Sequence, residues 1–274
     1  MENIVWLLDS ALGMGYEATD TDNEYARLKA AIKNNGGSIC ELGYRVQYEP
    51  SSDDEINLAY GSIGFIQRLR KYNNPGPWCN WEAMKCTSYY PAVGKYLLNK
   101  DYVMIPVGDI ARKMPELLRR FKGKMFIRPN SGNKCFSGFV FDGNVDHFMY
   151  RHMLHSCVDE LAVVSSCKTI DAEWRVFCTN ERLISWSLYK EKGMMKMEHG
   201  CNVAVSNICK DVIEALYPFP DPIFVLDICK SEGSYHLLEM GSFSCAGMYD
   251  CDVNEIVRIA TEIAIEDHNE IFYS

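Results

Sequence analysis

Residues 223–240 read IFVLDICKSEGSYHLLEM, two apolar segments joined by a polar turn. The segments 223–229 and 235–240 are rich in residues that favour strands, and the turn between them contains a glycine. Each segment carries one acid among apolar neighbours, Asp227 in the first and Glu239 in the second. The pattern predicts a β-hairpin that places the two carboxylates on neighbouring strands.

Two carboxylates on neighbouring strands can converge on one hard cation. Mg²⁺ prefers oxygen ligands and keeps part of its hydration, so that it can also bridge the phosphates of a nucleotide. The alternative is that Asp227 and Glu239 each accept hydrogen bonds from the backbone or pair with an arginine. Because carboxylates are seldom buried without partners, we favour a shared ion.

Upstream, a polar loop interrupts a second pair of strand-like segments. The segments 124–128 and 138–141 flank the loop 130–138, with Arg128 at the end of the first segment and Lys134 inside the loop. Two cations and the free N–H groups of a loop can hold a polyphosphate. An ordinary surface hairpin with solvated charges is the alternative, and the Walker A pattern is absent.

Arg175 is the third cation of interest. It lies in the strand-like segment 173–179, which can pair with 183–189 across a short turn. Alternation puts Glu173 and Arg175 on the same face, where Arg175 could reach a phosphate or a substrate carboxylate. The alternative is a cross-strand ion pair on a solvated face, which would contribute little to stability.

The rest of the chain alternates helices and strands. A strand is also expected at 161–167, and helices at 144–155, 208–216 and 253–267. The first part has the order of an α/β lobe, with strands at 4–8 and 56–60 and helices at 22–32 and 63–70.

Composition excludes several classes of protein. The 274 residues are 47% hydrophobic and carry a formal net charge of −9, which favours a folded protein and argues against unspecific nucleic-acid binding. No apolar run approaches the roughly 20 residues of a membrane span, and the first residues do not resemble a signal peptide. Twelve cysteines occur without a C-x-x-C spacing. We expect a cytoplasmic protein with no membrane partner and mostly reduced thiols.

Histidine and aromatic residues allow two further interpretations. The cysteines and histidines could form a metal-binding module, but His147, His152 and His155 fit one helix face better than a closed site. Four aromatic side chains could line a substrate cleft, although core packing is their commoner role: Phe136, Tyr189, Phe243 and Tyr249.

The order of these segments over roughly residues 95–252 resembles the ATP-grasp superfamily. Its members clamp ATP between two α+β lobes. They use a basic residue at a strand end, a glycine-containing phosphate loop, a hinge strand beside adenine and late acidic residues that bind magnesium. The Arg128-Pro129 pair and the segment 246–249 look like ATP-grasp proteins common in bacteriophages, with Arg-Pro in place of Lys-Pro.

The resemblance implies a site for each of these parts. Arg128 would be the basic strand-end residue, and the 130–138 loop would hold phosphate. The hinge would fall at 160–165 and contact adenine through main-chain atoms. Asp227 and Glu239 would bind Mg²⁺. The implied nucleotide contacts are Lys95, Arg128, Ser131, Gly132, Lys134, Val163, Val164 and Ser165.

The sequence departs from the family pattern in three places. Arg128 replaces a common lysine, and either Lys95 or Lys100 is the first nucleotide-binding lysine, with Lys95 slightly preferred. Relatives commonly have Glu-x-Asn at the second metal position, whereas Gly241 stands two residues after Glu239. Ser242, Ser244 or water would have to replace the missing oxygen ligand.

The implied fold is α/β and α+β, with an N-terminal α/β lobe (1–92), a small ATP-grasp lobe (93–160) and a large lobe with the metal site (161–274). The implied activity is peptide-bond-forming ligation of a small-molecule or peptide carboxylate to an amine through an acyl phosphate. Arg128 and Lys134 would neutralise charge, and Arg175 would steady the transferred phosphoryl group. A nucleotide-binding or sensing protein with impaired catalysis is the alternative.

Overall fold

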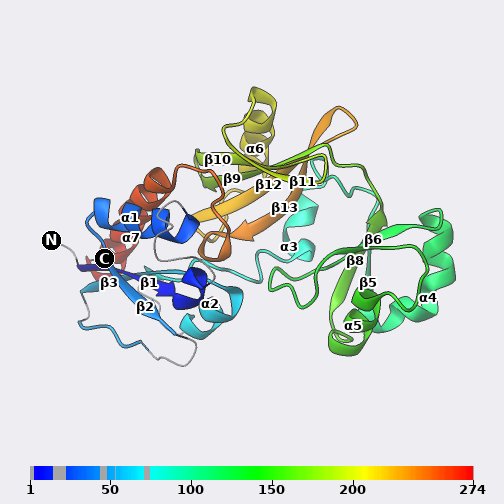
Figure 1. The fold of residues 1–274 in the computed structure, drawn as a ribbon, viewed down its shortest axis with the longest axis horizontal. Coiled ribbons are helices and arrows are strands. Elements are labelled where there is room, and N and C mark those ends of the chain that lie inside the picture. Colours follow the sequence, from blue (N-terminus) through cyan, green and yellow to red (C-terminus); the bar gives the residue numbers. More distant parts are fainter. Residues whose placement is uncertain (1–2, 15–22, 44–47, 53, 71–74, 274) are drawn as a thin grey trace.

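The computed structural model describes residues 3–14, 23–43, 48–52, 54–70 and 75–273. Within this part the chain forms three sheets in a row, with the N-terminal sheet at one end, the largest in the middle and the small-lobe sheet at the other end (Figure 1). The mixture of an α/β lobe and two α+β lobes confirms the predicted fold class.

The N-terminal sheet is parallel and has the order β2-β1-β3-β4. Its helices begin at capped positions, because Asn23 accepts a hydrogen bond from the backbone N–H of Ala26, and Ser62 caps the next helix in the same way. The strands and helices predicted in this lobe are confirmed. Its elements are β1 (Asn3–Asp9), β2 (Ser38–Leu42), β3 (Glu55–Tyr60), β4 (Pro75–Gly76), η1 (Ser10–Gly13), α1 (Glu24–Asn34) and α2 (Ile63–Leu69).

The small lobe has an antiparallel sheet of order β5-β8-β6-β7, which two helices accompany. It has its own apolar core, which includes Ile127, Phe141 and Val164. Its elements are β5 (Val103–Pro106), β6 (Met125–Pro129), β7 (Phe139–Phe141), β8 (Leu161–Ser166), α4 (Val107–Arg120) and α5 (Phe148–Ser156).

The large sheet is antiparallel, with the order β11-β10-β9-β12-β13. Side chains such as Val176, Leu226 and Leu237 point from one face into a core with the helices α3 and α6 (Figure 1). Its elements are β9 (Ala172–Thr179), β10 (Leu183–Glu191), β11 (Met194–His199), β12 (Ile223–Ser231), β13 (Ser234–Ser242), α3 (Cys86–Val93) and α6 (Val203–Leu216).

The opposite face of the large sheet packs against the N-terminal lobe. Phe177 and Val225 share one core with Trp6 and Tyr60 of the N-terminal strands and with Phe243 of the short helix η2 (Phe243–Cys245). The last helix, α7 (Val253–Tyr273), belongs to this core and packs on α1.

Three strands or helices differ from the sequence-based picture of the lobes. The strand β8 lies beyond the predicted boundary at residue 160, yet it pairs with β5 and β6 of the small sheet. The helix α3 lies before residue 93, yet it packs on the large sheet. The helix α4 was not anticipated. The lobe boundaries at 92 and 160 stay predictions.

Among the described residues, no helix combines the length and the apolar character that a membrane span requires.

Candidate functional site

The predicted hairpin of β12 and β13 brings the two acids together. Asp227 and Glu239 are directly opposite each other in the antiparallel register. Directly opposed residues point to the same face, with their Cβ atoms about 4.5–5.5 Å apart. The register shifts between Asp227 and Ile228, which pairs with Leu237, so that Leu238 is an extra residue that re-aims the strand.

Arg175 holds Asp227 from the neighbouring strand β9. Its guanidinium donates from Nε and Nη2 to the two carboxylate oxygens at 2.9 and 2.8 Å. A third donor, Nη1, reaches the carbonyl of Gly247 at 3.1 Å. Bidentate pairing of this kind fixes the orientation of both groups. The ion-pair alternative is therefore present in the structure.

Arg128 reaches Glu239 from the end of β6 in the small lobe. Its Nη2 lies 2.9 Å from one carboxylate oxygen, and its Nη1 donates to the carbonyl of Leu238 at 3.4 Å. Lys134 of the loop lies 3.8 Å from the other oxygen of Glu239. The lysine side chain is 58% exposed, whereas that of Arg128 is 12% exposed. Glu239 is thus shared by two cations of the small lobe.

The five charged side chains line one cavity of about 70 Å³ between the lobes. Its floor is the large sheet, and the N-terminal lobe contributes Ile63 and Trp81 to its wall. The structure therefore brings together the cations and the acids that the sequence singled out. The charged side chains are Arg128, Lys134, Arg175, Asp227 and Glu239.

The two acids differ in their environment. Burial raises the pKa of Asp227, and the nearby Glu239 adds to this effect, although Arg175 opposes it. Burial also disfavours the charged form of Glu239, but Arg128 and Lys134 outweigh burial and lower its pKa. Two carboxylates side by side with opposite pKa shifts form a site that a divalent cation would neutralise.

Asp227 and Glu239 fit a magnesium site that bound phosphates would complete. No group of three or more His, Cys, Asp or Glu side chains within the described residues could hold a metal alone. Mg²⁺ commonly takes one or two carboxylates and leaves its other positions to phosphate oxygens and water. The two acids and the cavity beside them match that donor set.

The missing third ligand has a steric explanation. A Cβ atom at Gly241 would lie 2.9 Å from Cγ2 of Val225. Side chains at 241 and 225 face each other in the register of the hairpin, and Val225 belongs to the core shared with the N-terminal lobe. An asparagine at 241 would therefore need a smaller neighbour. Ser242 lines the cavity, while Ser244 is buried without lining it.

The phosphate-loop candidate is anchored at its start. Asn130 accepts hydrogen bonds from Cys86 and Thr87 and thereby caps the N-terminus of α3, while its own N–H donates to Leu161. Ser131 is buried, whereas Gly132 and Lys134 line the cavity. The part of the loop that can meet a phosphate thus begins at Gly132.

The expected hinge residues lie inside the small sheet. Val163 and Val164 are opposite residues of both β5 and β6, and Ser165 is opposite Phe126 of β6. Because β8 is a central strand, the main chain of these residues is already engaged in the sheet. The geometry therefore does not support adenine contacts through this main chain. The linking residues are 167–171, after the strand ends.

Lys95 is not part of the cavity. It is exposed, its Nζ lies 4.7 Å from the ring centre of Tyr96, and its charge faces Asp211 and Glu214 of α6. Because α6 covers the opposite face of the large sheet, the geometry does not support the preference for Lys95. Lys100 is also exposed and lies near His236. Neither lysine lines the cavity.

Two tyrosines that the sequence left unassigned lie beside Arg175. The rings of Tyr189 and Tyr249 stack with centres 4.7 Å apart, and the guanidinium carbon of Arg175 lies 5.7 and 5.1 Å from these centres. Such contacts add cation–π attraction to the ion pair with Asp227. By contrast, Phe136 and Phe243 are core residues.

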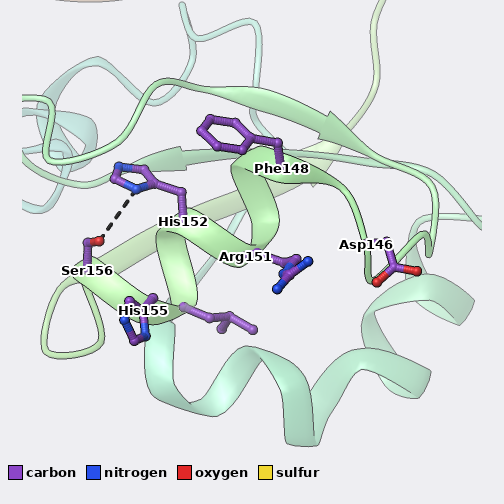
Figure 2. Close-up of a pocket in the computed structure, with 7 residues that line it drawn as sticks. Asp146, Phe148, Arg151, His152, His155 and Ser156 are labelled. Atoms are coloured by element: carbon purple, nitrogen blue, oxygen red, sulfur yellow. Dashed lines mark hydrogen bonds between the residues drawn. The ribbon is translucent and has the colours of Figure 1, made fainter.

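Larger cavities occur away from the charged cluster. One of about 720 Å³ lies between β10 and α6, and one of about 690 Å³ lies along α5. In the α5 cavity the rings of His152 and His155 lie apart, and His152 is directed toward Ser156 (Figure 2). His147 instead stacks on Phe139. The histidines therefore do not form the metal-binding module considered above.

A cavity of phosphate-binding cations and paired acids, held between two α+β lobes, defines an ATP-grasp protein. A family model of the ATP-grasp domain, the second family of its clade, matches residues 108–259, and the chain belongs to this family. No curated protein matches the sequence.

Solved structures of ligases share the fold over nearly the whole chain. The D-cycloserine synthetase DcsG matches with a TM-score of 0.65 at 10% identity, covering 96% of this chain and 99% of the other. A D-alanine–D-alanine ligase from Bacillus anthracis complexed with ATP has a TM-score of 0.58 at 10% identity, covering 98% and 99%. The ATP-grasp ligase PsnB, complexed with a minimal precursor, has a TM-score of 0.56 at 9% identity, covering 97% and 99%.

Proposed function

We propose that this protein is an ATP-dependent carboxylate–amine ligase that works through an acyl phosphate. One observation carries the proposal: Arg128 and Lys134 from the small lobe meet Arg175, Asp227 and Glu239 from the large sheet in one cavity. Phosphoryl transfer depends mainly on positioning and on neutralising charge, and these residues supply both. The fold shared with several ligases supports the same class of reaction.

Each residue has a role in this proposal. Arg128 and Lys134 hold the β- and γ-phosphates of ATP, and Asp227 with Glu239 holds the cation. Mg²⁺ bound there would neutralise phosphate charge during transfer. Arg175 lies deeper in the sheet and would stabilise the phosphoryl group as the substrate carboxylate takes it up. The amine then attacks the acyl carbon, and phosphate leaves.

The nucleotide-free cavity already contains charge partners that mimic the bound state. Arg128 and Arg175 each pair with a carboxylate in place of a phosphate. When nucleotide binds, the arginines can turn to phosphate oxygens, and the carboxylates become available to the cation. Because charges are exchanged rather than left unpaired, the cavity can open without exposing a lone buried ion.

We propose small-molecule or peptide carboxylates and amines as substrates, with no role for nucleic acid or a membrane. The charged cavity suits carboxylate and phosphate groups, and the two stacked tyrosines beside Arg175 offer an apolar surface for the rest of a substrate. The finer resemblance to bacteriophage ATP-grasp proteins also stays a prediction.

The test is a screen of amino acids and short peptides for ATP-dependent phosphate release, with product masses measured. We expect ADP, phosphate and a product that lacks one water relative to its two substrates. Arg175→Met should abolish release, while Arg258→Met should leave it unchanged, since Arg258 forms only exposed ion pairs on α7. Formation of AMP and pyrophosphate would contradict the acyl-phosphate route.

A nucleotide-binding or sensing protein with impaired catalysis is the second candidate. The observation that favours it is Gly241, which leaves the site without a common third oxygen ligand. In that case MgATP would raise the melting temperature, but no phosphate release would exceed that of Arg175→Met with any substrate tried.

A further inference from the structure

Two free cysteines meet at the wall of the charged cavity. Cys245 ends η2 and lines the cavity together with Lys134 and Asp227. Cys79 lies on the segment between β4 and α3, is 3% exposed, and belongs to an apolar cluster against which Cys245 packs. The two thiols are free and hydrogen-bonded to each other. They join the chain before α3 to the turn after β13.

The two thiols are not equivalent. The hydrogen bond from Cys79 lowers the pKa of Cys245 against the opposing effect of burial, and Ser242 and Lys134 contribute in the same direction. Burial raises the pKa of Cys79, and its hydrogen bond to Cys245 raises it further. Cys245 is therefore the thiol that ionises first, and it is also the one that faces the cavity.

We propose that Cys79 and Cys245 form a reversible disulfide when the protein meets a hydroperoxide, so that the wall of the charged cavity is a thiol modification site. The Cys245 thiolate attacks one peroxide oxygen, which breaks the O–O bond, gives a sulfenic acid and, for hydrogen peroxide, releases hydroxide that takes up a proton to become water. The Cys79 sulfur then attacks the sulfenyl sulfur and releases a second water. Two thiols are oxidised, and one peroxide is reduced.

A second pair of thiols in the same chain provides an internal comparison. Cys135 and Cys157 are also in contact, and Cys157 is buried in the small lobe. Burial raises the pKa of Cys135 to about 12, and the hydrogen bond with Cys157 adds to the shift. Its thiolate is scarce at neutral pH, so proximity alone does not make this pair reactive.

The position of Cys245 links the modification to nucleotide binding. Cys245 and Lys134 line the same cavity, so that a nucleotide held by Lys134 covers the thiol. A disulfide to Cys79 would in turn fix the turn after β13 against the segment before α3. We therefore expect bound MgATP to slow the oxidation of Cys245.

The experiment treats the full-length protein with hydrogen peroxide at neutral pH, blocks remaining thiols, and maps the peptides by mass spectrometry. We expect one early crosslink, between the peptides that contain Cys79 and Cys245, which dithiothreitol reverses. It should form at least tenfold faster than any link between Cys135 and Cys157. Cys79→Ser should leave a sulfenic acid on Cys245 that a dimedone probe captures.

The result does not depend on enzymatic activity, so it stands apart from the test of the ligase. A crosslink of Cys245 to another cysteine such as Cys40, which packs against the same cluster, would overturn the proposal. So would equal rates for the two pairs, or a Cys245 thiol that stays unreacted while Cys135 oxidises. The wild-type map alone decides these outcomes, so the proposal survives a variant that fails to fold.

Discussion

Asp227 and Glu239 are directly opposite each other on β12 and β13, yet their cationic partners come from different lobes. Arg175 holds Asp227 from within the large sheet, whereas Arg128 holds Glu239 from the small lobe. The pair of acids is therefore the point at which the two lobes meet electrostatically, and the following expectations start from it.

Asp227→Asn and Glu239→Gln keep side-chain size and remove charge from the proposed cation site. We expect both variants to lose turnover and to lose the magnesium-dependent rise in melting temperature with ATP. Asp227→Asn should also destabilise the nucleotide-free protein by about 1–3 kcal/mol, because the Asp227 side chain is 4% exposed and that of Glu239 is 24% exposed. Melting curves with and without MgATP measure both effects. Variants that MgATP still stabilises as it does the wild type would contradict the cation site.

Arg128 is expected to bind phosphate, and the family pattern offers lysine as a natural replacement. Arg128→Lys keeps the charge but loses the bond to the Leu238 carbonyl, so we expect only a small loss of ATP affinity. Arg128→Met should weaken ATP binding between about tenfold and about a hundredfold, the range for a lost charged hydrogen bond. Isothermal titration calorimetry measures both.

The Arg128→Met variant leaves the charge of Glu239 with Lys134 alone, which could weaken binding indirectly. The double variant Arg128→Met with Glu239→Gln removes that charge as well. If single and double variants bind ATP as tightly as wild type, Arg128 does not contact phosphate.

Gly241→Asn restores the oxygen ligand that relatives carry, but it meets Val225. We expect the single substitution to destabilise the protein by about 1–3 kcal/mol through overpacking. Adding Val225→Ala makes room and should recover part of that loss. The double variant should then need less Mg²⁺ for half-maximal stabilisation by ATP, whereas Val225→Ala alone should not. An unchanged magnesium requirement in the double variant would show that position 241 does not reach the cation.

Asp221 introduces a pH dependence of stability far from the charged cavity. Burial raises its pKa from 3.8 to about 6, although the backbone N–H of Asn80 donates to it at 2.8 Å. Because the folded protein holds this proton more tightly than the unfolded chain, the contribution of Asp221 falls as pH rises from about 4 to about 6. The shift of roughly 2 pKa units corresponds to about 3 kcal/mol.

Asp221→Asn keeps an acceptor for Asn80 and removes the titration. We expect the difference in melting temperature between variant and wild type to grow from pH 4 to pH 6.5 in favour of the variant. Asp109→Asn, which alters an exposed acid of α4, serves as the control and should show no such trend. A constant difference across this range would contradict the raised pKa.

The sequence predicted the strands of the site well, because alternating and apolar runs identify strands directly. The hairpin of β12 and β13 and the pair of β9 and β10 are both present. The bulge at Leu238 was not foreseen, since a single extra residue leaves no trace in an alternating pattern. It is this bulge that aligns Glu239 with Asp227.

Other features depend on packing that a sequence does not record. An apolar run such as 161–166 identifies a strand but not its neighbours, so Val163 and Val164 were assigned to a free hinge edge. The helix α4 contains Pro115, a residue at which a helical pattern is normally ended. Every residue of β11 is exposed, so it lacks the alternation that reveals a strand.

The apolar cores divide the molecule differently from the three sheets. The N-terminal lobe, α7 and the large sheet share one core, whereas the small lobe buries its own residues around Ile127 and Phe141. Tilting the N-terminal lobe would tear shared apolar contacts, while tilting the small lobe breaks mainly the polar contacts of Arg128, Lys134 and Asn130. Substrate entry should therefore work as a jaw with one fixed and one swinging half.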